Sequence, residues 1–243
     1  MFDIANERLD LGLGVTVVQP IAQGLVDRLN AQDGLYTVLL RGKENGVVAR
    51  QTRVVGCVRG GLNPYEDFDA FLAQARNPDL RFIVSNTTEA GIVYTGQDTP
   101  EDKPQASFPG KLTRLLYERW QAGLPGVIML PVELIDDNGG ELRECVFKTA
   151  EQWKLPAAFM AWLEQENVFA STLVDRIVTG YPRPEAQALC EELGYEDGLL
   201  DVAEPFALWV IEGPASIAKA LPLDRAGLPV VFTDNVKPYK MRK

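Results

Sequence analysis

Residues 81–91 read RFIVSNTTEAG, a short apolar segment followed at once by polar side chains and a glycine. Arg81–Ser85 has the length and apolar content of a buried parallel strand. Ligands of an open parallel sheet bind beyond the carboxyl ends of its strands, so the polar residues lie where a ligand would bind. These residues are Asn86, Thr87, Thr88 and Glu89. A loop without a ligand explains them equally well, because Asn and Thr also favour turns.

Short apolar segments of the same kind alternate with amphipathic segments along the chain. Further strands are expected at Leu13–Val18, Val127–Val132, Phe206–Ile211 and Leu228–Phe232. Helices are expected at Tyr65–Arg76, Pro109–Trp120, Glu141–Trp153, Pro156–Glu166 and Arg183–Leu193, the first capped by Asn63 with a Glu66 capping box and the last stopped by Gly194. This alternation predicts an α/β fold, with a mostly parallel sheet and helices on both faces.

One region departs from the alternation. Gly34–Arg41 and Val47–Val58 are typical of a β-hairpin, with Asn45-Gly46 at its turn. We therefore expect an antiparallel insertion into the α/β frame. Neither a repeat nor a Gly/Ser linker divides the sequence, so residues 1–243 are expected to form one domain, with a candidate sub-boundary near Gly180 where the sequence becomes richer in Pro and acidic residues.

Composition restricts the class of partner. The 243 residues include 24 Lys and Arg against 34 Asp and Glu, giving a formal charge of −10. Duplex nucleic acid and anionic membranes are therefore poor partners. No apolar run approaches the ~20 residues needed to cross a bilayer, and the first ten residues do not resemble a secretory signal. We expect a soluble, cytoplasmic protein.

The chain contains no histidine, which excludes Ser-His-Asp and Cys-His nucleophilic sites and His-ligated metal centres. No metal site is predicted, and a catalytic proton must move through Lys, Tyr or a carboxylate. Cys57, Cys145 and Cys190 lie too far apart for a Cys-x-x-Cys pair, and we expect all three to be reduced core residues.

Two other charged regions remain open to more than one interpretation. Asp175 and Arg176 interrupt the apolar segment Asn167–Pro182, where a salt bridge and a functional contact are both consistent with the pattern. Glu133 follows a predicted strand, and the polar residues 136–139 after it either form part of a site or cap the next helix.

Five segments carry a resemblance that spans nearly the whole chain. They are Asn86–Ile92, Ser107–Thr113, Glu133–Gly139, Ser171–Pro182 and Lys237–Lys243. Together they resemble the mannitol dehydrogenase family of polyol-specific long-chain dehydrogenases, and within it the altronate oxidoreductase (tagaturonate reductase) branch. Because the segments keep the family's order, coincidence across all five is improbable.

The resemblance implies a zinc-independent NAD enzyme with an N-terminal Rossmann domain and a mostly helical C-terminal domain. The implied reaction interconverts D-altronate and D-tagaturonate in hexuronate breakdown, and a full-length member is expected to be monomeric. Two alternatives remain. In the first, the chain is a catalytically inactive Rossmann-like module that binds a nucleotide or a partner protein. In the second, it belongs to an enzyme that acts on fructuronate or mannitol.

The resemblance also implies roles for individual residues. Lys243 matches the general acid/base lysine of a Lys-x4-Asn-x2-His pattern, whose Asn and His have no counterpart in the sequence. Gln19 falls where the family binds the adenosine ribose. Since no carboxylate stands at that point, the preference for NAD over NADP is implied by the family alone. The nicotinamide side of the cleft is matched by Asn86, Thr87, Thr88 and Glu89.

On the implied substrate side, Ser171 stands where mannitol-type members have an oxyanion-hole asparagine. Glu133 replaces an aspartate of the mannitol branch. Asp175 and Arg176 match the family without change, and Arg176 is a candidate for binding the substrate carboxylate.

The family begins with a strand and a glycine-rich phosphate loop, whereas this sequence is expected to begin within the helix that follows. Gly12 and Gly14 do not replace that loop, because they precede a strand rather than follow one. We therefore expect a fragment that lacks the first strand and the helical C-terminal domain. Such a fragment would bind NADH poorly, have low activity and self-associate through uncovered apolar surface.

Overall fold

The computed structural model describes residues 1–44 and 47–240, and Cα positions divide the chain into two compact units. Unit 1 comprises Met1–Leu62, Asp175–Leu208 and Leu223–Pro229. Unit 2 comprises Asn63–Val174, Trp209–Pro222 and Val230–Lys243. Each unit is therefore built from separate stretches of sequence. The sub-boundary near Gly180 stays a prediction.

Unit 1 contains two small sheets with short helices. In chain order its elements are α1 (Phe2–Leu9), β1 (Val15–Val18), α2 (Val26–Ala31), β2 (Tyr36–Glu44), β3 (Val47–Val55), β4 (Val58–Leu62), β9 (Val178–Gly180), α7 (Ala186–Leu193) and β10 (Asp201–Ala203). Strands β1 and β4 pair in parallel. The other sheet has the order β3-β2-β10-β9, in which β10 is parallel to β2 and antiparallel to β9.

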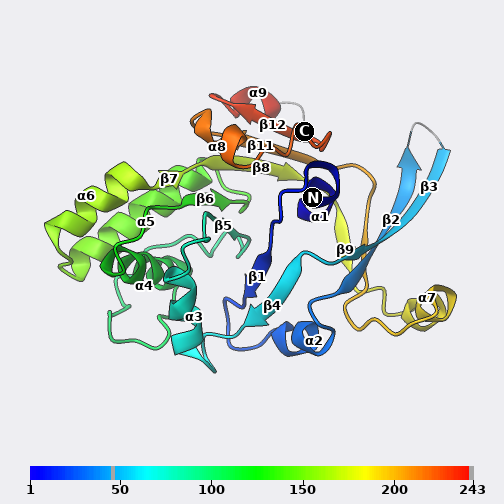
Figure 1. The fold of residues 1–243 in the computed structure, drawn as a ribbon, viewed down its shortest axis with the longest axis horizontal. Coiled ribbons are helices and arrows are strands. Elements are labelled where there is room, and N and C mark those ends of the chain that lie inside the picture. The colour runs from blue at the N-terminus through cyan, green and yellow to red at the C-terminus, as the bar shows by residue number, and fades with distance from the viewer. Residues whose placement is uncertain (45–46, 241–243) are drawn as a thin grey trace. The chain divides into compact units, whose positions relative to one another are not determined.

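The predicted hairpin is present as β2 and β3, which pair antiparallel from Tyr36 opposite Val55 (Figure 1). Its predicted turn residues, Asn45 and Gly46, lie outside the described residues. The single second strand predicted over Val47–Val58 is wrong. The chain leaves the hairpin at Gly56, whose N–H is bound by the Asp3 carboxylate, and then starts β4 beside β1.

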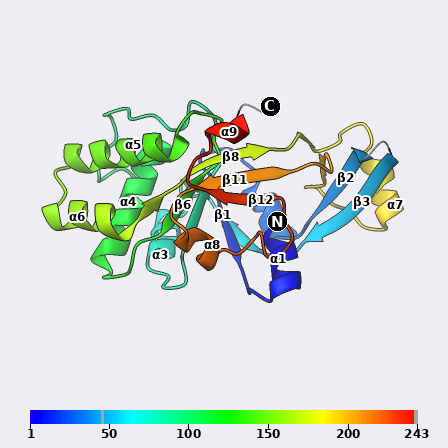
Figure 2. The same ribbon diagram turned by 90° about the horizontal axis from the view of Figure 1, so that it is seen from above.

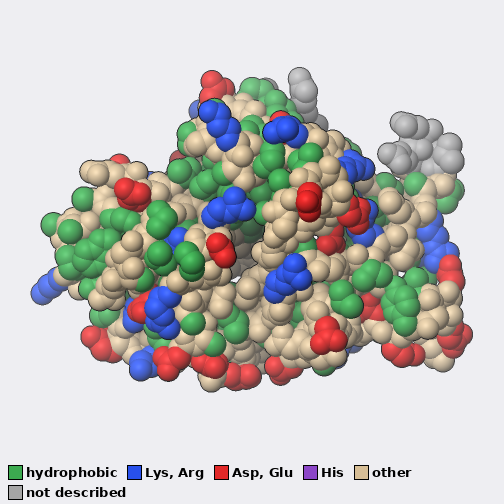
Figure 3. Space-filling model, in the orientation of Figure 1, with side chains coloured by type: hydrophobic (Ala, Val, Ile, Leu, Met, Phe, Trp, Pro, Cys, Tyr) green, Lys and Arg blue, Asp and Glu red, His purple; other side chains and the backbone are tan. Residues whose placement is uncertain are grey.

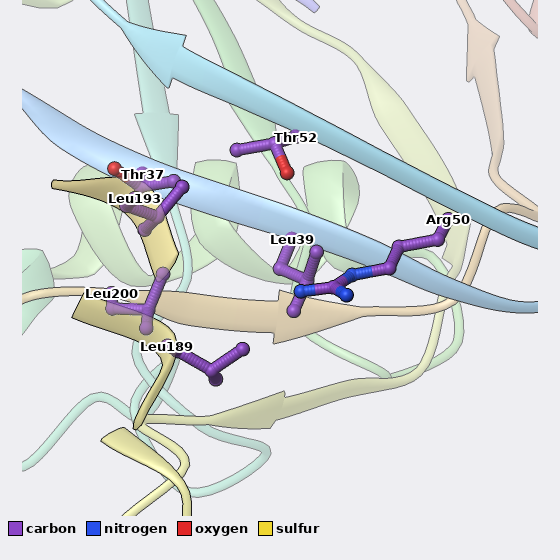
Figure 4. Close-up of a pocket in the computed structure, with 7 residues that line it drawn as sticks. All are labelled: Thr37, Leu39, Arg50, Thr52, Leu189, Leu193 and Leu200. Atoms are coloured by element: carbon purple, nitrogen blue, oxygen red, sulfur yellow. The ribbon is translucent and has the colours of Figure 1, made fainter. Parts of the chain in front are cut away.

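Helix α7 packs beneath the hairpin. Leu189 and Leu193 of α7 and the nearby Leu200 approach Leu39 of β2 (Figure 4). The space that they line with Thr37, Arg50 and Thr52 has a volume of ≈ 10 Å³, about the minimum for a single water. This space belongs to the apolar core and is too small for a cofactor. Gly194 ends α7 as predicted, and it has a left-handed conformation with φ 81.

Unit 2 also contains two small sheets, together with the longest helices. Its elements are α3 (Phe68–Ala75), β5 (Phe82–Ser85), α4 (Phe108–Gln121), β6 (Ile128–Pro131), α5 (Asn138–Gln152), α6 (Ala157–Glu166), β7 (Val168–Phe169), β8 (Ser171–Asp175), β11 (Leu208–Glu212), α8 (Ser216–Ala220), β12 (Val230–Thr233) and α9 (Lys237–Lys240). Strands β5, β6 and β7 pair in parallel, with α3, α4, α5 and α6 grouped around them (Figure 1). Strands β8, β11 and β12 form the second sheet (Figure 2).

The core of unit 2 lies between these helices and β6. Its buried side chains include Leu112, Leu116, Met129, Leu142, Val146, Phe159 and Leu163. Arg119 is buried beside them, and its guanidinium donates to the carbonyl oxygens of Ala75, Asn77, Leu80 and Pro125. Because those carbonyls lie at or just beyond the C-terminal ends of α3 and α4, Arg119 satisfies acceptors that the helices leave unpaired.

The observed boundaries correct several predictions. The N-cap of α3 is Asp67, which accepts a bond from the Ala70 N–H, so the cap predicted at Asn63 is wrong. Asn63 does contact Glu66, but in a separate turn before the helix. Thr16 and Val17 of β1 are exposed, because β1 pairs only with β4 among the described strands, so its predicted burial is also wrong.

The face of the protein drawn in Figure 3 carries both charges. Lys and Arg side chains are scattered over it, whereas many of the Asp and Glu side chains lie along its lower margin. None of the described helices combines the length and apolarity that a membrane crossing requires. Cys57, Cys145 and Cys190 are buried and form no disulfide, which confirms their predicted place in the core.

Candidate functional site

The carboxyl ends of β5 and β6 meet at one edge of their sheet. Ser85 and Pro131, the last residues of these strands, lie opposite each other in the parallel register. The predicted residues Asn86–Glu89 therefore leave the sheet beside the loop that contains Glu133. Asn86, Thr88 and Glu89 are exposed, whereas Thr87 is half-buried. This edge presents polar side chains where an open parallel sheet binds its ligands.

The Glu133 carboxylate is the centre of the contacts at this edge. It is 3% exposed, and it accepts hydrogen bonds from the Ser85 hydroxyl at 3.0 Å, the Thr87 N–H at 3.0 Å and the Thr87 hydroxyl at 2.8 Å. Hydrogen bonds to an ionised acceptor are stronger than neutral ones. The sequence identified Glu133 as a candidate, but gave no indication that its carboxylate binds the predicted cofactor segment.

Asn138 holds the backbone beneath this edge. The side chain is 0% exposed, and its amide nitrogen lies 2.9–3.0 Å from the carbonyl oxygens of Pro131, Glu133 and Thr172. Its amide oxygen accepts from the Thr172 N–H at 2.8 Å. Asn138 thus ties the end of β6 to β8. Sequence reasoning missed this role because the run 136–139 also fitted a helix cap, and Asp137 is indeed the N-cap of α5.

Ser171, the first residue of β8, contacts the N-terminal end of α5. Its hydroxyl donates to the Asp137 carboxylate at 2.6 Å, and it accepts from the Gly139 N–H at 3.3 Å. Gly139 permits this approach, since a Cβ there would lie 2.6 Å from the carbonyl atoms of Ala170. The predicted substrate residue Ser171 is therefore built into the junction between α5 and β8.

The last described segment joins the same loop. Lys240 in α9 donates to the Asp136 carboxylate at 2.7 Å. This hydrogen bond, with the charge of Lys240, holds the pKa of Asp136 below its ordinary value. The candidate acid/base Lys243 lies outside the described residues.

Gln19 in unit 1 has its side chain turned into its own loop. It is 6% exposed, and its amide nitrogen donates to the carbonyls of Ile21 at 2.8 Å and Ala22 at 3.1 Å. The glycine at position 24 leaves room for this side chain, because a Cβ there would lie 2.0 Å from the Gln19 amide oxygen. Gln19 therefore shapes the loop between β1 and α2.

Asp175 and Arg176 also belong to unit 1. The side chain of Arg176 is exposed. The segment becomes more exposed after β8, and the Arg176 guanidinium donates to the carbonyls of Glu204, Pro205 and Phe206. These carbonyls orient its positive charge without neutralising it.

The structure thus brings together Thr87 and Glu133, with Ser171 joined to the same region of unit 2 through Asp137 and Asn138. Gln19, Asp175 and Arg176 are placed within unit 1. Among the described residues, no group of three or more Cys, Asp or Glu side chains is arranged to hold a metal ion. The chemistry available at this edge is hydrogen bonding and charge.

Comparison with known proteins identifies relatives of the whole chain. The family model of the mannitol dehydrogenase Rossmann domain matches residues 5–225. The chain is 51% identical to an altronate oxidoreductase of Yersinia enterocolitica and 50% identical to one of Enterobacter sp. strain 638, over 99% of its own length in both cases. It covers 51% of each relative, so it spans about half the length of the curated proteins that it matches.

Solved structures share the fold. The ternary complex of Pseudomonas fluorescens mannitol 2-dehydrogenase with NAD and D-mannitol superposes with a TM-score of 0.81 at 22% identity, covering 98% of this chain and 50% of that one. A substrate-free D-sorbitol dehydrogenase gives a TM-score of 0.76 at 24% identity, covering 94% and 49%. At these identities the likeness establishes the α/β, Rossmann-like fold.

Proposed function

Because the chain belongs to the mannitol dehydrogenase family, we propose that it carries most of the cofactor domain of an NAD-dependent oxidoreductase that interconverts D-altronate and D-tagaturonate. The observation that carries this proposal is the 51% identity to altronate oxidoreductase along 99% of the chain. The polar edge of β5 and β6 supports it, because it offers hydrogen-bonding groups where this fold class binds ligands.

The residues at this edge fit the nicotinamide side of the cofactor. Asn86 and Thr88 are exposed and polar, and Thr87 is held from below by Glu133. NAD, when bound, supplies or accepts the hydride. The part of this chain is to bind the cofactor and fix its orientation. On the adenosine side, Gln19 is proposed to act by shaping the loop after β1, since its amide is already bonded within that loop.

Ser171, Asp175 and Arg176 are proposed for the substrate side. Arg176 suits the carboxylate of a sugar acid, because a guanidinium held by carbonyl oxygens keeps its full charge for an anion. The Ser171 hydroxyl would have to exchange Asp137 for a substrate oxygen.

The proton is proposed to move through Lys243. Without histidine, an amine is the remaining group of suitable chemistry that the family resemblance places at the reacting oxygen. Lys243 would donate to the carbonyl oxygen as tagaturonate is reduced and accept the proton in reverse. We place the reaction in the cytoplasm, where free thiols such as those of this chain stay reduced.

The test is reduction of tagaturonate, followed by loss of NADH absorbance. It uses the 243-residue chain alone and a chimera in which the chain replaces the matching segment of the Yersinia altronate oxidoreductase. We expect turnover by the chimera and little by the chain alone. A folded chimera that binds neither NADH nor tagaturonate would contradict the proposal and favour an inactive binding module. A preference for fructuronate or mannitol would reassign the substrate.

A further inference from the structure

The buried Glu133 carboxylate is poorly placed to bind a substrate itself. It is 3% exposed, and its two oxygens already accept from Ser85 and from both donors of Thr87. A ligand would have to compete with three bonds to reach it. Since Thr87 belongs to the exposed polar segment after β5, Glu133 is bonded directly to the segment proposed to face the cofactor.

The backbone of Glu133 is fixed as firmly as its side chain. Its carbonyl oxygen accepts from the buried Asn138 amide at 2.9 Å, and the same amide contacts Pro131 and Thr172. A shift of the Glu133 backbone would break its bond to the Asn138 amide, which is itself held by β6 and β8. A carboxylate on a fixed backbone imposes one position on the groups that bind it.

We propose that Glu133 is a positioning residue for cofactor binding, acting through Thr87 rather than contacting the substrate. This inference rests on the proposed function. The carboxylate fixes the Thr87 N–H and hydroxyl, and so sets the direction in which Asn86 and Thr88 leave the strand. Losing this anchor should weaken binding of NADH and leave binding of the sugar acid unchanged.

Glu133→Gln tests the inference, because it keeps the shape of the side chain but replaces one acceptor oxygen with a donor that faces Ser85 or Thr87. In the chimera with the Yersinia enzyme, we expect KM for NADH to rise about tenfold, while KM for tagaturonate stays within about twofold. In the chain as given, the Thr87 amide should exchange its hydrogen about tenfold faster. A general structural defect would not separate the two KM values.

Glu118→Gln is the matched control. Glu118 accepts hydrogen bonds from Arg76 and Arg114 near the C-terminal end of α4, so the same substitution removes a bonded carboxylate that has no contact with Ser85 or Thr87. We expect its KM for NADH to equal that of the parent. A double-mutant cycle adds Thr87→Val, whose effect on NADH affinity should shrink in the Glu133→Gln background.

The possible results distinguish the two proposals. An active chimera whose Glu133→Gln variant keeps the parental KM for NADH would overturn the positioning role. A raised KM for tagaturonate alone would also overturn it, and would make Glu133 a substrate ligand. If the parental chimera reduces no tagaturonate, the proposed function fails. The NADH affinities of the two forms, measured by nicotinamide fluorescence, then still decide the role of Glu133.

Discussion

The buried polar side chains of the described residues bind mainly backbone groups. The partners of each side chain indicate whether it supports the fold or the candidate site. Arg119 and Asn138 together satisfy carbonyl oxygens at the ends of α3, α4 and β6. Glu133 differs, because its partners belong to a segment whose other side chains are exposed. We interpret Arg119 and Asn138 as supports for the fold, and Glu133 as a link between the fold and the site.

The Cys57 thiol gives a prediction of pH dependence. Burial, reinforced by the nearby Asp3 carboxylate, raises the pKa of Cys57 to about 11. The unfolded chain releases this proton at about pH 8.5, so above that pH it binds fewer protons than the folded chain and stability falls. We expect Cys57→Ala to lose less stability than the parent between pH 7 and pH 10, the difference being about 2 kcal/mol.

Urea unfolding at both pH values measures this difference. Cys145→Ala is a useful comparison, because burial also raises the pKa of Cys145. Equal pH dependence of the parent and Cys57→Ala would show that the Cys57 thiol ionises at its ordinary pH in the folded protein.

At the scale of single residues, the sequence selected candidate positions that are hydrogen-bonded in the fold, but it did not reveal their partners. Glu133, Thr87 and Ser171 were all candidates, and all three occur in the bonded network of unit 2. Their partners depend on tertiary structure, so the spacing of residues could not reveal them. Gln19 shows the same limit, because nothing in the sequence indicated that its amide would be turned into its own loop.

The contact between α5 and β8 depends on the absence of a side chain at Gly139. A Cβ at this position would lie 2.6 Å from the Ala170 carbonyl carbon and 2.7 Å from the Ser171 nitrogen, and backbone atoms cannot move aside cheaply. We expect Gly139→Ala to destabilise the chain by about 1–3 kcal/mol. Thermal and urea unfolding measure the loss.

Gly56→Ala is the control for this prediction. A Cβ at Gly56 would meet only the Leu35 side chain, at 3.7 Å, which is an ordinary contact distance. Its effect should stay below that of Gly139→Ala. If the two variants are equally stable, then α5 can move away from β8 without cost.

At the scale of helices and strands, apolar periodicity predicted most elements to within a few residues. Helices α4 and α6 and strands β5 and β6 lie within their predicted ranges or extend one residue beyond them. Strand β4 was missed because its sequence, VRGGL, continues directly from the hairpin and contains two glycines. Its pairing with β1 arises from residues more than 40 positions apart, a separation that local pattern does not report.

At the scale of the whole molecule, the division into two units was not visible in the sequence. Residues 209–222 and 230–243 belong to unit 2, whereas 223–229 belong to unit 1. Segments this short, which pass from one unit to the other and back, are not marked by a change in amino-acid composition. The family resemblance, by contrast, was readable because its segments keep their order along the chain, and the matched family domain confirms it.

The cofactor gives a prediction at this scale. The described residues contain no Gly-x-Gly turn that follows a strand and begins a helix. They therefore lack the backbone N–H groups at a helix N-terminus that would bind a pyrophosphate. We expect the 243-residue chain alone to bind NADH with a Kd above about 100 μM, measured by energy transfer from tryptophan to nicotinamide. Micromolar binding by the chain alone would contradict this expectation.

The pair Asn138-Gly139 has a chemical consequence for the ageing of the protein. An asparagine followed by glycine is prone to deamidation, in which the glycine nitrogen attacks the side-chain amide. In the fold the Asn138 amide is buried and bonded on both sides, and the Gly139 nitrogen is bonded to Ser171, so attack is hindered. In unfolded chains the Asn138 amide is no longer buried or hydrogen-bonded, so deamidation can proceed. The carboxylate that replaces the amide would then repel the carbonyl oxygens of Pro131 and Glu133 in the fold. Damage acquired while unfolded would therefore prevent correct refolding.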